Sequence, residues 1–242
     1  MVEELRDGKQ ISAETVVLDD EDIRIAAITR TVAGPLPARQ AVRHCVFAHD
    51  TLLHHPVIRQ VVSRTVRALG ITLGVLSVRM RLTPRGPRVL DVAGHIADDL
   101  IPLLVKRATG IDLPSAAADL ATGRTPSLAA TRQRAAAIQF LYPSATGSLR
   151  RLTVHPHADR HPHLDRIALT RHPGDHVTSA SQATPDDRIA HIVALGPDSP
   201  ACHSALDQIA QYIHADIMPT PGEPPRADRE RHLYAWAADC RR

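Results

Sequence analysis

The chain has 242 residues, a formal net charge of +3 and 43% hydrophobic residues, a balance typical of a folded globular protein. Aromatic residues make up only 2%, too few for a surface that stacks nucleic-acid bases, and the 29 basic side chains are interleaved with 26 acidic ones. No apolar run approaches the length of a membrane-spanning helix. We therefore expect neither a nucleic-acid partner nor a membrane partner.

The cysteines and the N-terminal segment indicate a reducing compartment. Cys45, Cys202 and Cys240 are odd in number and far apart, which does not suit a disulfide framework. The first ten residues are charged and contain no apolar signal region. These features predict a cytoplasmic protein.

The N-terminal part of the chain predicts a β-hairpin. Residues 11–18 and 23–28 are rich in β-branched and apolar side chains, and four consecutive acids at 19–22 lie between them. The following stretch, residues 33–56, contains proline and histidine without a clear periodicity, and we interpret it as a connection.

The next hundred residues predict helices on either side of a second hairpin. Apolar side chains recur along 56–69 with helical spacing, and Gly70 follows at the position where a helix commonly ends. Asp112 is suited to cap a helix that starts after it. The expected elements, in chain order, are a helix over 56–69, strands over 71–82 and 88–92, and helices over 96–109 and 112–122.

The second half of the sequence changes to short strands between Pro- and Gly-containing turns. The expected elements are strands over 135–141, 151–154, 167–169 and 189–193, then a helix over 199–214. The whole pattern predicts an α+β fold, in which an antiparallel sheet with helices on one face is followed by a small β-rich lid. The predicted regions are 1–130 for the first part, 131–217 for the lid-like part, and 218–242 for a Pro-rich linker with a charged helical tail.

One segment is more specific than the rest. Residues 68–112 contain a helix ending in Ala-Leu-Gly, a Thr-Pro-Arg-Gly-Pro turn between two strands, and an Ala-Thr-Gly-Ile-Asp close. This segment resembles the C-terminal half of the ATP-grasp domain in carboxylate–amine ligases. The sequence around 2–15 is similar to the hinge and the Ser-x-Glu strand of that family, and the likeness extends to about residue 215. The resemblance implies a truncated and degenerate member of the ATP-grasp superfamily.

The departures from the family pattern fall on its metal ligands. In these ligases an acid on each strand of the hairpin, together with an asparagine, holds Mg²⁺ against the phosphates of ATP. Those positions are occupied here by Arg79, Asp91 and Ala93. The family's phosphate- or substrate-binding arginine is His95, and a conserved lysine of the grasp is Thr31. We therefore expect no nucleotide cofactor and no bound metal.

The same positions could form a different site. If the two strands pair as in the family, Arg79, Asp91 and His95 face one cleft, with Ser77 on the face of Arg79. One interpretation is an ion pair that lines an inactive site. The other is an acid/base site in which His95 and Asp91 are catalytic, while Arg79 and Ser77 bind a substrate carboxylate.

Further histidines are weaker candidates. His49 lies on a segment that borders the substrate in the family, so we include it as a substrate-binding candidate against the alternative of a surface loop. His155, His157, His161 and His163 form two His-x-His pairs that could bind a transition metal, although a solvated loop is the simpler interpretation.

Three functions are compatible with these observations. The first is an ATP-independent enzyme of secondary metabolism that performs cyclisation, elimination or hydrolysis on a small carboxylate- or amino-acid-like substrate. The second is the C-terminal half of a split ATP-dependent ligase. The third is a non-catalytic partner or scaffold in a biosynthetic pathway. For each of them we expect a homodimer, or a partner protein that covers the surface of the missing domain.

Overall fold

The computed structural model describes residues 8–34 and 40–220, and these residues divide into two compact units. The first unit contains the described residues up to Thr31, together with His44–Ala136 and Pro197–Ser199. The second contains Val32–Arg43, Ala137–Gly196 and the described residues from Pro200 onward. The three regions expected from the sequence remain a prediction, and residues 221–242 of the proposed tail lie outside the described residues.

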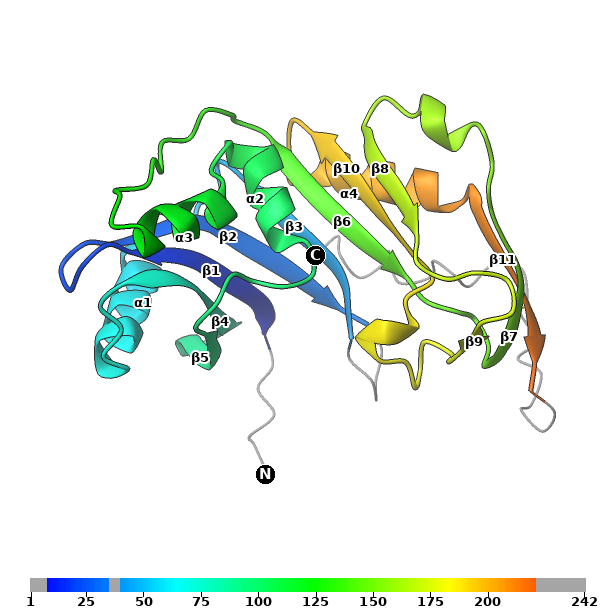
Figure 1. Cartoon of the computed structure of the whole chain (residues 1–242), viewed down its shortest axis with the longest axis horizontal. Helices are drawn as coiled ribbons and strands as arrows, with labels where there is room; N and C mark the ends of the chain where they lie inside the picture. The colour runs from blue at the N-terminus through cyan, green and yellow to red at the C-terminus, as the bar shows by residue number, and fades with distance from the viewer. Residues whose placement is uncertain (1–7, 35–39, 221–242) are drawn as a thin grey trace. The chain divides into compact units, whose positions relative to one another are not determined.

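Two sheets organise the fold (Figure 1). Eight strands are hydrogen-bonded in the order β5-β4-β1-β2-β3-β6-β10-β8, and a smaller sheet has the order β11-β7-β9. The pairs β1–β2, β1–β4, β4–β5 and β8–β10 are antiparallel. This arrangement confirms the α+β class. Among the described residues, no helix combines the length and apolarity that crossing a membrane requires.

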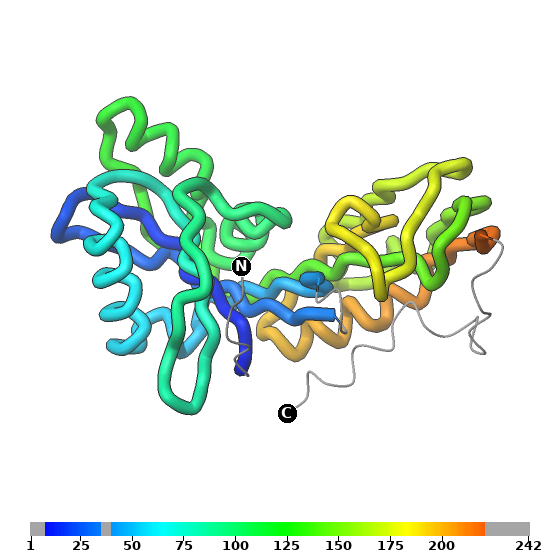
Figure 2. Tube along the Cα trace, turned by 90° about the horizontal axis from the view of Figure 1, so that it is seen from below, coloured from blue at the N-terminus to red at the C-terminus, as the bar shows by residue number. Residues whose placement is uncertain are grey.

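The first unit is built on two antiparallel hairpins. Its strands are β1 (Lys9–Val17), β4 (Gly74–Thr83) and β5 (Gly86–Ala93), with β2 (Ile23–Ala33) up to Thr31 and β3 (Ala41–Phe47) from His44. Its helices are α1 (Pro56–Ala68), α2 (Ile101–Thr109) and α3 (Leu113–Ala121). The predicted hairpins are confirmed, and Figure 2 shows β4 and β5 as one long loop of chain. Asp112 caps α3 as expected, because its side chain accepts a hydrogen bond from the amide of Ser115.

The core of the first unit lies between the sheet and α1. Ile58, Val62 and Val66 form the buried face of this helix. They pack against alternate side chains of the strands, namely Ile11, Ala13, Val17, Ile28, Leu76, Val78 and Met80. Because alternate residues of a strand point to opposite faces, the intervening side chains lie on the other face of the sheet.

The second unit contains the remaining elements. They are β6 (Ala135–Leu141), β7 (Gly147–Val154), β8 (Leu164–Leu169), β9 (His176–Val177), β10 (Ala190–Gly196), α4 (Ser199–Ala210) and β11 (Ile213–Pro219). The predicted strands of this half are confirmed. The helix expected to reach residue 214 is wrong at its end, since α4 stops at Ala210 and the chain returns as β11 against β7.

Two further expectations from the sequence are corrected in the first unit. The connection expected over 33–56 contains the seven-residue strand β3. The helix expected from residue 96 begins only at Ile101, because Asp99 and Leu100 have φ angles of 58° and 59°. Two consecutive left-handed residues cannot belong to a right-handed helix.

Candidate functional site

The face of the sheet opposite α1 is polar at its centre. On β1, Ile11 and Ala13 belong to the core, whereas Ser12 and Glu14 alternate with them and lie on the other face. Ser12 and Glu14 are nevertheless only 4% and 1% exposed. A buried carboxyl group is costly unless it is hydrogen-bonded or neutral, so its surroundings decide its state.

Glu14 is held by a set of hydroxyl groups. Ser12 Oγ and Thr29 Oγ1 both donate to Glu14 Oε1, at 2.6 and 2.9 Å. Burial raises the pKa of the Glu14 carboxyl, while hydrogen bonds from Ser12, Thr29 and Ser77 and the proximity of His44 oppose that rise. Because burial is the larger effect, the site favours the protonated carboxylic acid.

Replacing Glu14 by glutamine is expected to stabilise the protein near neutral pH. A carboxyl group whose pKa is raised by folding contributes stability below its unfolded pKa and loses it as the pH rises through the folded pKa. Glutamine preserves the hydrogen bonds and cannot ionise. Glu14→Gln should therefore raise the unfolding free energy at pH 8 by on the order of 1 kcal/mol.

This increase in the unfolding free energy should vanish below about pH 4.5, the ordinary pKa of a glutamate side chain. Urea denaturation at several pH values measures it, and Glu21→Gln, in the exposed hairpin turn, is the matched control. A destabilisation by Glu14→Gln that grows as the pH rises above about 4.5 would show instead that folding lowers the pKa of this carboxyl and keeps it ionised.

An ion pair lies on the neighbouring hairpin. Arg79 of β4 is directly opposite Asp91 of β5, and its Nε and Nη2 atoms donate to Asp91 Oδ2 at 3.0 and 2.5 Å. Both side chains are about half exposed. Arg79 also lies opposite Ser12 of β1, so the ion pair borders the polar face that carries Glu14.

A line of polar side chains in mutual contact runs from β2 through β3 to the loop before α2. Thr31 Oγ1 lies 3.0 Å from Nδ1 of His44, and Nε2 of His44 lies 3.2 Å from Asp99 Oδ2. The His44 side chain is only 5% exposed and that of Asp99 is 26% exposed, whereas Thr31 is half-buried. Asp99 is one of the two residues in the left-handed conformation.

The other sequence-derived candidates lie in different surroundings. His95 is exposed, and its Nδ1 donates to the backbone carbonyl of Ile96 at 2.8 Å. His49 is exposed with its ring edge-on to Phe47. Ser77 is buried and donates to Glu14 rather than facing solvent. Burial raises the pKa of the Cys45 thiol to about 11, so this cysteine is uncharged at neutral pH.

The His-x-His loop has a regular local structure. Nδ1 of His155 accepts the amide hydrogen of His157, and Nδ1 of His161 accepts that of His163, both at 3.2 Å. The ring of His155 stacks on Tyr212. Within residues 8–34 and 40–220, no group of three or more His, Cys, Asp or Glu side chains is arranged to hold a metal ion. The interpretation of this segment as a solvated loop stays a prediction.

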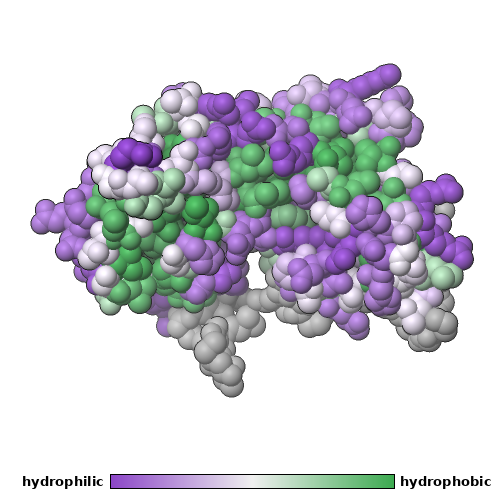
Figure 3. All heavy atoms as spheres, in the orientation of Figure 1, coloured by the Kyte–Doolittle hydropathy of each residue, from purple (hydrophilic) through white to green (hydrophobic). Residues whose placement is uncertain are grey.

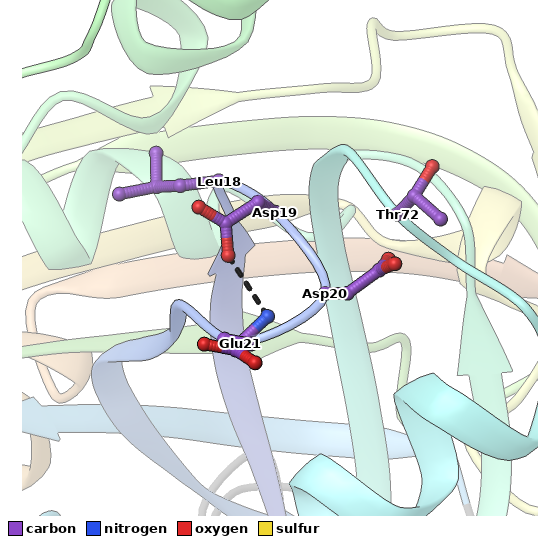
Figure 4. Close-up of a pocket in the computed structure, with 5 residues that line it drawn as sticks. All are labelled: Leu18, Asp19, Asp20, Glu21 and Thr72. Carbon is purple, nitrogen blue, oxygen red and sulfur yellow. Dashed lines mark hydrogen bonds between the residues drawn. The ribbon is translucent and has the colours of Figure 1, made fainter.

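The acidic hairpin turn lines a surface hollow (Figure 4). Leu18, Asp19, Asp20 and Glu21 surround it with Thr72. Asp19 Oδ1 accepts the amide hydrogens of Glu21 and Asp22 at 2.8 and 2.7 Å, which shapes the turn. The hollow lies at the turn that connects β1 to β2, and we assign it no chemistry.

Comparisons with known proteins agree on one fold. Residues 139–218 match the family described as L-amino acid ligase C-terminal domain 2. A curated relative, the uncharacterised protein y4rH of Sinorhizobium fredii (strain NBRC 101917 / NGR234), is 28% identical over 225 residues, which cover 90% of this chain and 44% of the relative.

Solved structures extend the likeness to nearly the whole chain. An L-amino acid ligase from Bacillus licheniformis is 15% identical with a TM-score of 0.75, over 88% of this chain and 53% of the ligase. Phosphoribosylglycinamide synthetase from Anaerococcus prevotii is 17% identical with a TM-score of 0.73, over 89% and 55%. A biotin carboxylase from Campylobacter jejuni is 10% identical with a TM-score of 0.63, over 90% and 48%.

The chain has an ATP-grasp fold. The resemblance predicted from residues 68–112 is therefore confirmed at the level of the fold. The chain spans about half the length of the proteins that it matches.

The three positions that the resemblance assigns to metal binding hold side chains that do not fit Mg²⁺. Mg²⁺ requires oxygen ligands in a nearly octahedral arrangement. At the three positions, Arg79 brings a cation that cannot act as a ligand, Asp91 accepts hydrogen bonds from it, and Ala93 has no donor atom. A metal ion beside Asp91 would have to displace the guanidinium group and tolerate its charge.

Sequence reasoning missed His44 and Asp99 as members of the polar face. Glu14 was noted only as part of the Ser-x-Glu match, and His44 lay in the assumed connection. The alternation of Val42, His44 and Val46 with Arg43 and Cys45 is compatible with a strand, and this signal could have revealed β3.

Proposed function

We propose that this ATP-grasp chain acts without ATP, as an enzyme of secondary metabolism that performs acid/base chemistry on a small carboxylate- or amino-acid-like substrate. One observation carries the proposal: an ion pair between Arg79 and Asp91 stands where the fold's relatives would place oxygen ligands for Mg²⁺. The replacement supplies a guanidinium group, which binds carboxylates through paired hydrogen bonds.

The roles follow from the surroundings of each side chain. The half-exposed Arg79 binds the substrate carboxylate, and Asp91 orients its guanidinium group. Exposed His95 exchanges a proton with the substrate, since its Nδ1 is engaged by the Ile96 carbonyl and its Nε2 is the remaining ring nitrogen. Glu14, whose pKa is raised by burial, maintains the polar face beneath them.

Conversion of a substrate in the absence of ATP tests this proposal. The protein would be incubated with amino-acid esters, amides and related carboxylates, with and without Mg²⁺ and ATP, and products would be followed by mass spectrometry. We expect conversion that is independent of ATP. Arg79→Met should lower kcat/KM by about 10- to 100-fold, as expected for loss of a charge-assisted hydrogen bond. Conversion only with Mg²⁺ and ATP would refute the proposal.

The C-terminal half of a split ATP-dependent ligase is the second candidate. The observation in its favour is that the chain spans about half the length of its relatives, one of which is an L-amino acid ligase. This candidate requires a second polypeptide that supplies both the missing half and a metal site. Adding such a polypeptide would then produce ligation that depends on Mg²⁺ and ATP.

A partner or scaffold role, or a homodimer, is favoured by exposed apolar side chains. Val57 and Leu69 on or next to α1, and Leu73 before β4, are 41, 57 and 54% exposed. Figure 3 shows apolar atoms gathered over α1. A second copy of the chain, or a partner protein, would remove this surface from water. Sedimentation velocity over a range of concentrations measures whether the chain associates with itself.

A further inference from the structure

The chain of contacts from Asp99 through His44 to Thr31 places a carboxylate, an imidazole and a hydroxyl group in one line. The three side chains come from separate elements: Thr31 from β2, His44 from β3, and Asp99 from the loop before α2. Their consecutive separations of 3.0 and 3.2 Å are within hydrogen-bonding distance. This is the order of groups that activates a hydroxyl nucleophile in acyl transfer.

The proton positions follow from the chemistry of the three groups. An ionised carboxylate can only accept hydrogen bonds, so the neutral His44 ring carries its hydrogen on Nε2, where it faces Asp99. Nδ1 is then the acceptor, and the Thr31 hydroxyl donates to it. The ring is thereby oriented to take the Thr31 proton, and the resulting imidazolium would be stabilised by Asp99.

Backbone strain accompanies this arrangement. Asp99 and Leu100 both have left-handed φ angles, and neither is a glycine. This conformation is unfavourable for a residue that is not glycine, and it is tolerated where the surroundings impose it. The loop that adopts this conformation also brings Asp99 to His44, so the same few residues carry both the unfavourable backbone conformation and the contact.

Burial separates the roles of the three side chains. The His44 side chain is only 5% exposed, which strengthens its interaction with Asp99. Thr31 is half-buried and is the member of the line beyond the ring, away from Asp99. His44 is therefore shielded, whereas Thr31 and Asp99 at the two ends of the line are partly exposed, and of these two only Thr31 carries a hydroxyl group that can act as a nucleophile.

We propose that Thr31, His44 and Asp99 form an acyl-transfer site for small ester-type carbonyl compounds. Thr31 Oγ1 attacks the carbonyl carbon as its proton passes to His44 Nδ1, and the bond to the leaving alkoxide breaks as His44 returns that proton to it. Water then attacks the acyl carbon and gives a proton to His44. The bond between the acyl carbon and Thr31 Oγ1 breaks as His44 returns that proton to the Thr31 oxygen. Ester and water become acid and alcohol. Asp99 is the positioning residue.

This inference rests on the proposed function because it specifies hydrolysis as the ATP-independent reaction. Its test does not require the natural substrate. The full chain would be treated with diisopropyl fluorophosphate and with p-nitrophenyl acetate, and adducts would be located by intact-mass measurement and peptide mapping. We expect one adduct on Thr31. An unmodified protein, or an adduct on another residue alone, would overturn the proposal.

Variants at the three positions test which residue is labelled and which residue activates it. Thr31→Val should abolish the adduct, Thr31→Ser should retain it, and His44→Asn should slow its formation at least 100-fold. Thr122→Val, which alters an exposed hydroxyl at the end of α3, is the matched control and should label as the parent does. Labelling of Thr31→Val at the parent rate would overturn the proposal even if other variants were poorly folded.

The positioning role of Asp99 has its own readout. Nitrogen-15 NMR of the imidazole should show hydrogen on Nε2 of His44 in the parent and a mixture of the two tautomers in Asp99→Asn. Labelling should slow at least 10-fold in that variant while its melting temperature stays close to the parent's. An unchanged tautomer with an unchanged labelling rate would remove Asp99 from the site.

The two proposals can fail separately. If a substrate is converted without ATP but Thr31 is never acylated, the acyl-transfer site is wrong and the ATP-independent function stands. If Thr31 is acylated but the natural substrate is converted only with Mg²⁺ and ATP, the acyl-transfer site stands and the ATP-independent function is wrong.

Discussion

Replacing Arg43 by methionine should destabilise the second unit by about 3–5 kcal/mol, the usual cost of breaking a buried ion pair from one side. Arg43 is 5% exposed, its Nε and Nη2 donate to Gln139 Oε1 at 3.0 and 2.5 Å, and Nη2 also donates to Asp207. Methionine fills similar space but leaves both partners without their donor. Both partners lie within the segment that matches the ligase C-terminal domain.

Urea denaturation followed by circular dichroism measures this loss. Arg24→Met is the matched control, because Arg24 forms an ion pair with Asp22 at an exposed turn, where such pairs contribute little. We expect almost no change in the control. Equal midpoints for the two variants would show that the Arg43 network is not a source of stability.

Replacing Gly147 by alanine should cost about 3 kcal/mol or more, at the upper end of overpacking changes. A Cβ atom at this position would lie 2.0 Å from the carbonyl oxygen of Met218 and 2.8 Å from its carbon. These are backbone atoms of the paired strand β11, so no side-chain rotation relieves the clash. Strand β11 would have to move away from β7.

Hydrogen exchange at the β11 amides, together with urea denaturation, reports that movement. Gly94→Ala is the control, since a Cβ atom there meets no other atom within 4 Å. We expect faster exchange in β11 for Gly147→Ala and parent-like behaviour for Gly94→Ala. Parent-like exchange in both variants would contradict the close approach of the two strands.

The parts of the fold that are encoded locally were predictable from the sequence. The first hairpin follows from β-branched runs around four acids, and α1 follows from the spacing of Ile58, Val62 and Val66. The ion pair of Arg79 with Asp91 was one of the two interpretations that the resemblance offered, and the register of β4 and β5 places the two residues opposite each other.

Elements stabilised by distant partners were not predictable in the same way. Strand β3 places Arg43 and His44 next to each other within a run of five buried residues, and these polar side chains disguise the strand in the sequence. Each is satisfied by residues far along the chain: Gln139 and Asp207 for Arg43, and Asp99 for His44. For the same reason the Thr31–His44–Asp99 line could not be inferred without the fold. The alternation of Ile213, Ala215 and Ile217 in β11 was an available signal that the helix prediction overrode.

Calorimetric titration with ATP, with and without Mg²⁺, tests the central claim that this ATP-grasp chain works without the metal–nucleotide complex. The parent would be compared with the double variant Arg79→Glu/Ala93→Asn, which restores oxygen ligands at two of the three positions. We expect Mg²⁺ to leave the response of the parent to ATP unchanged and to add a binding signal only in the double variant. Tight ATP binding by the parent that requires Mg²⁺ would contradict this claim.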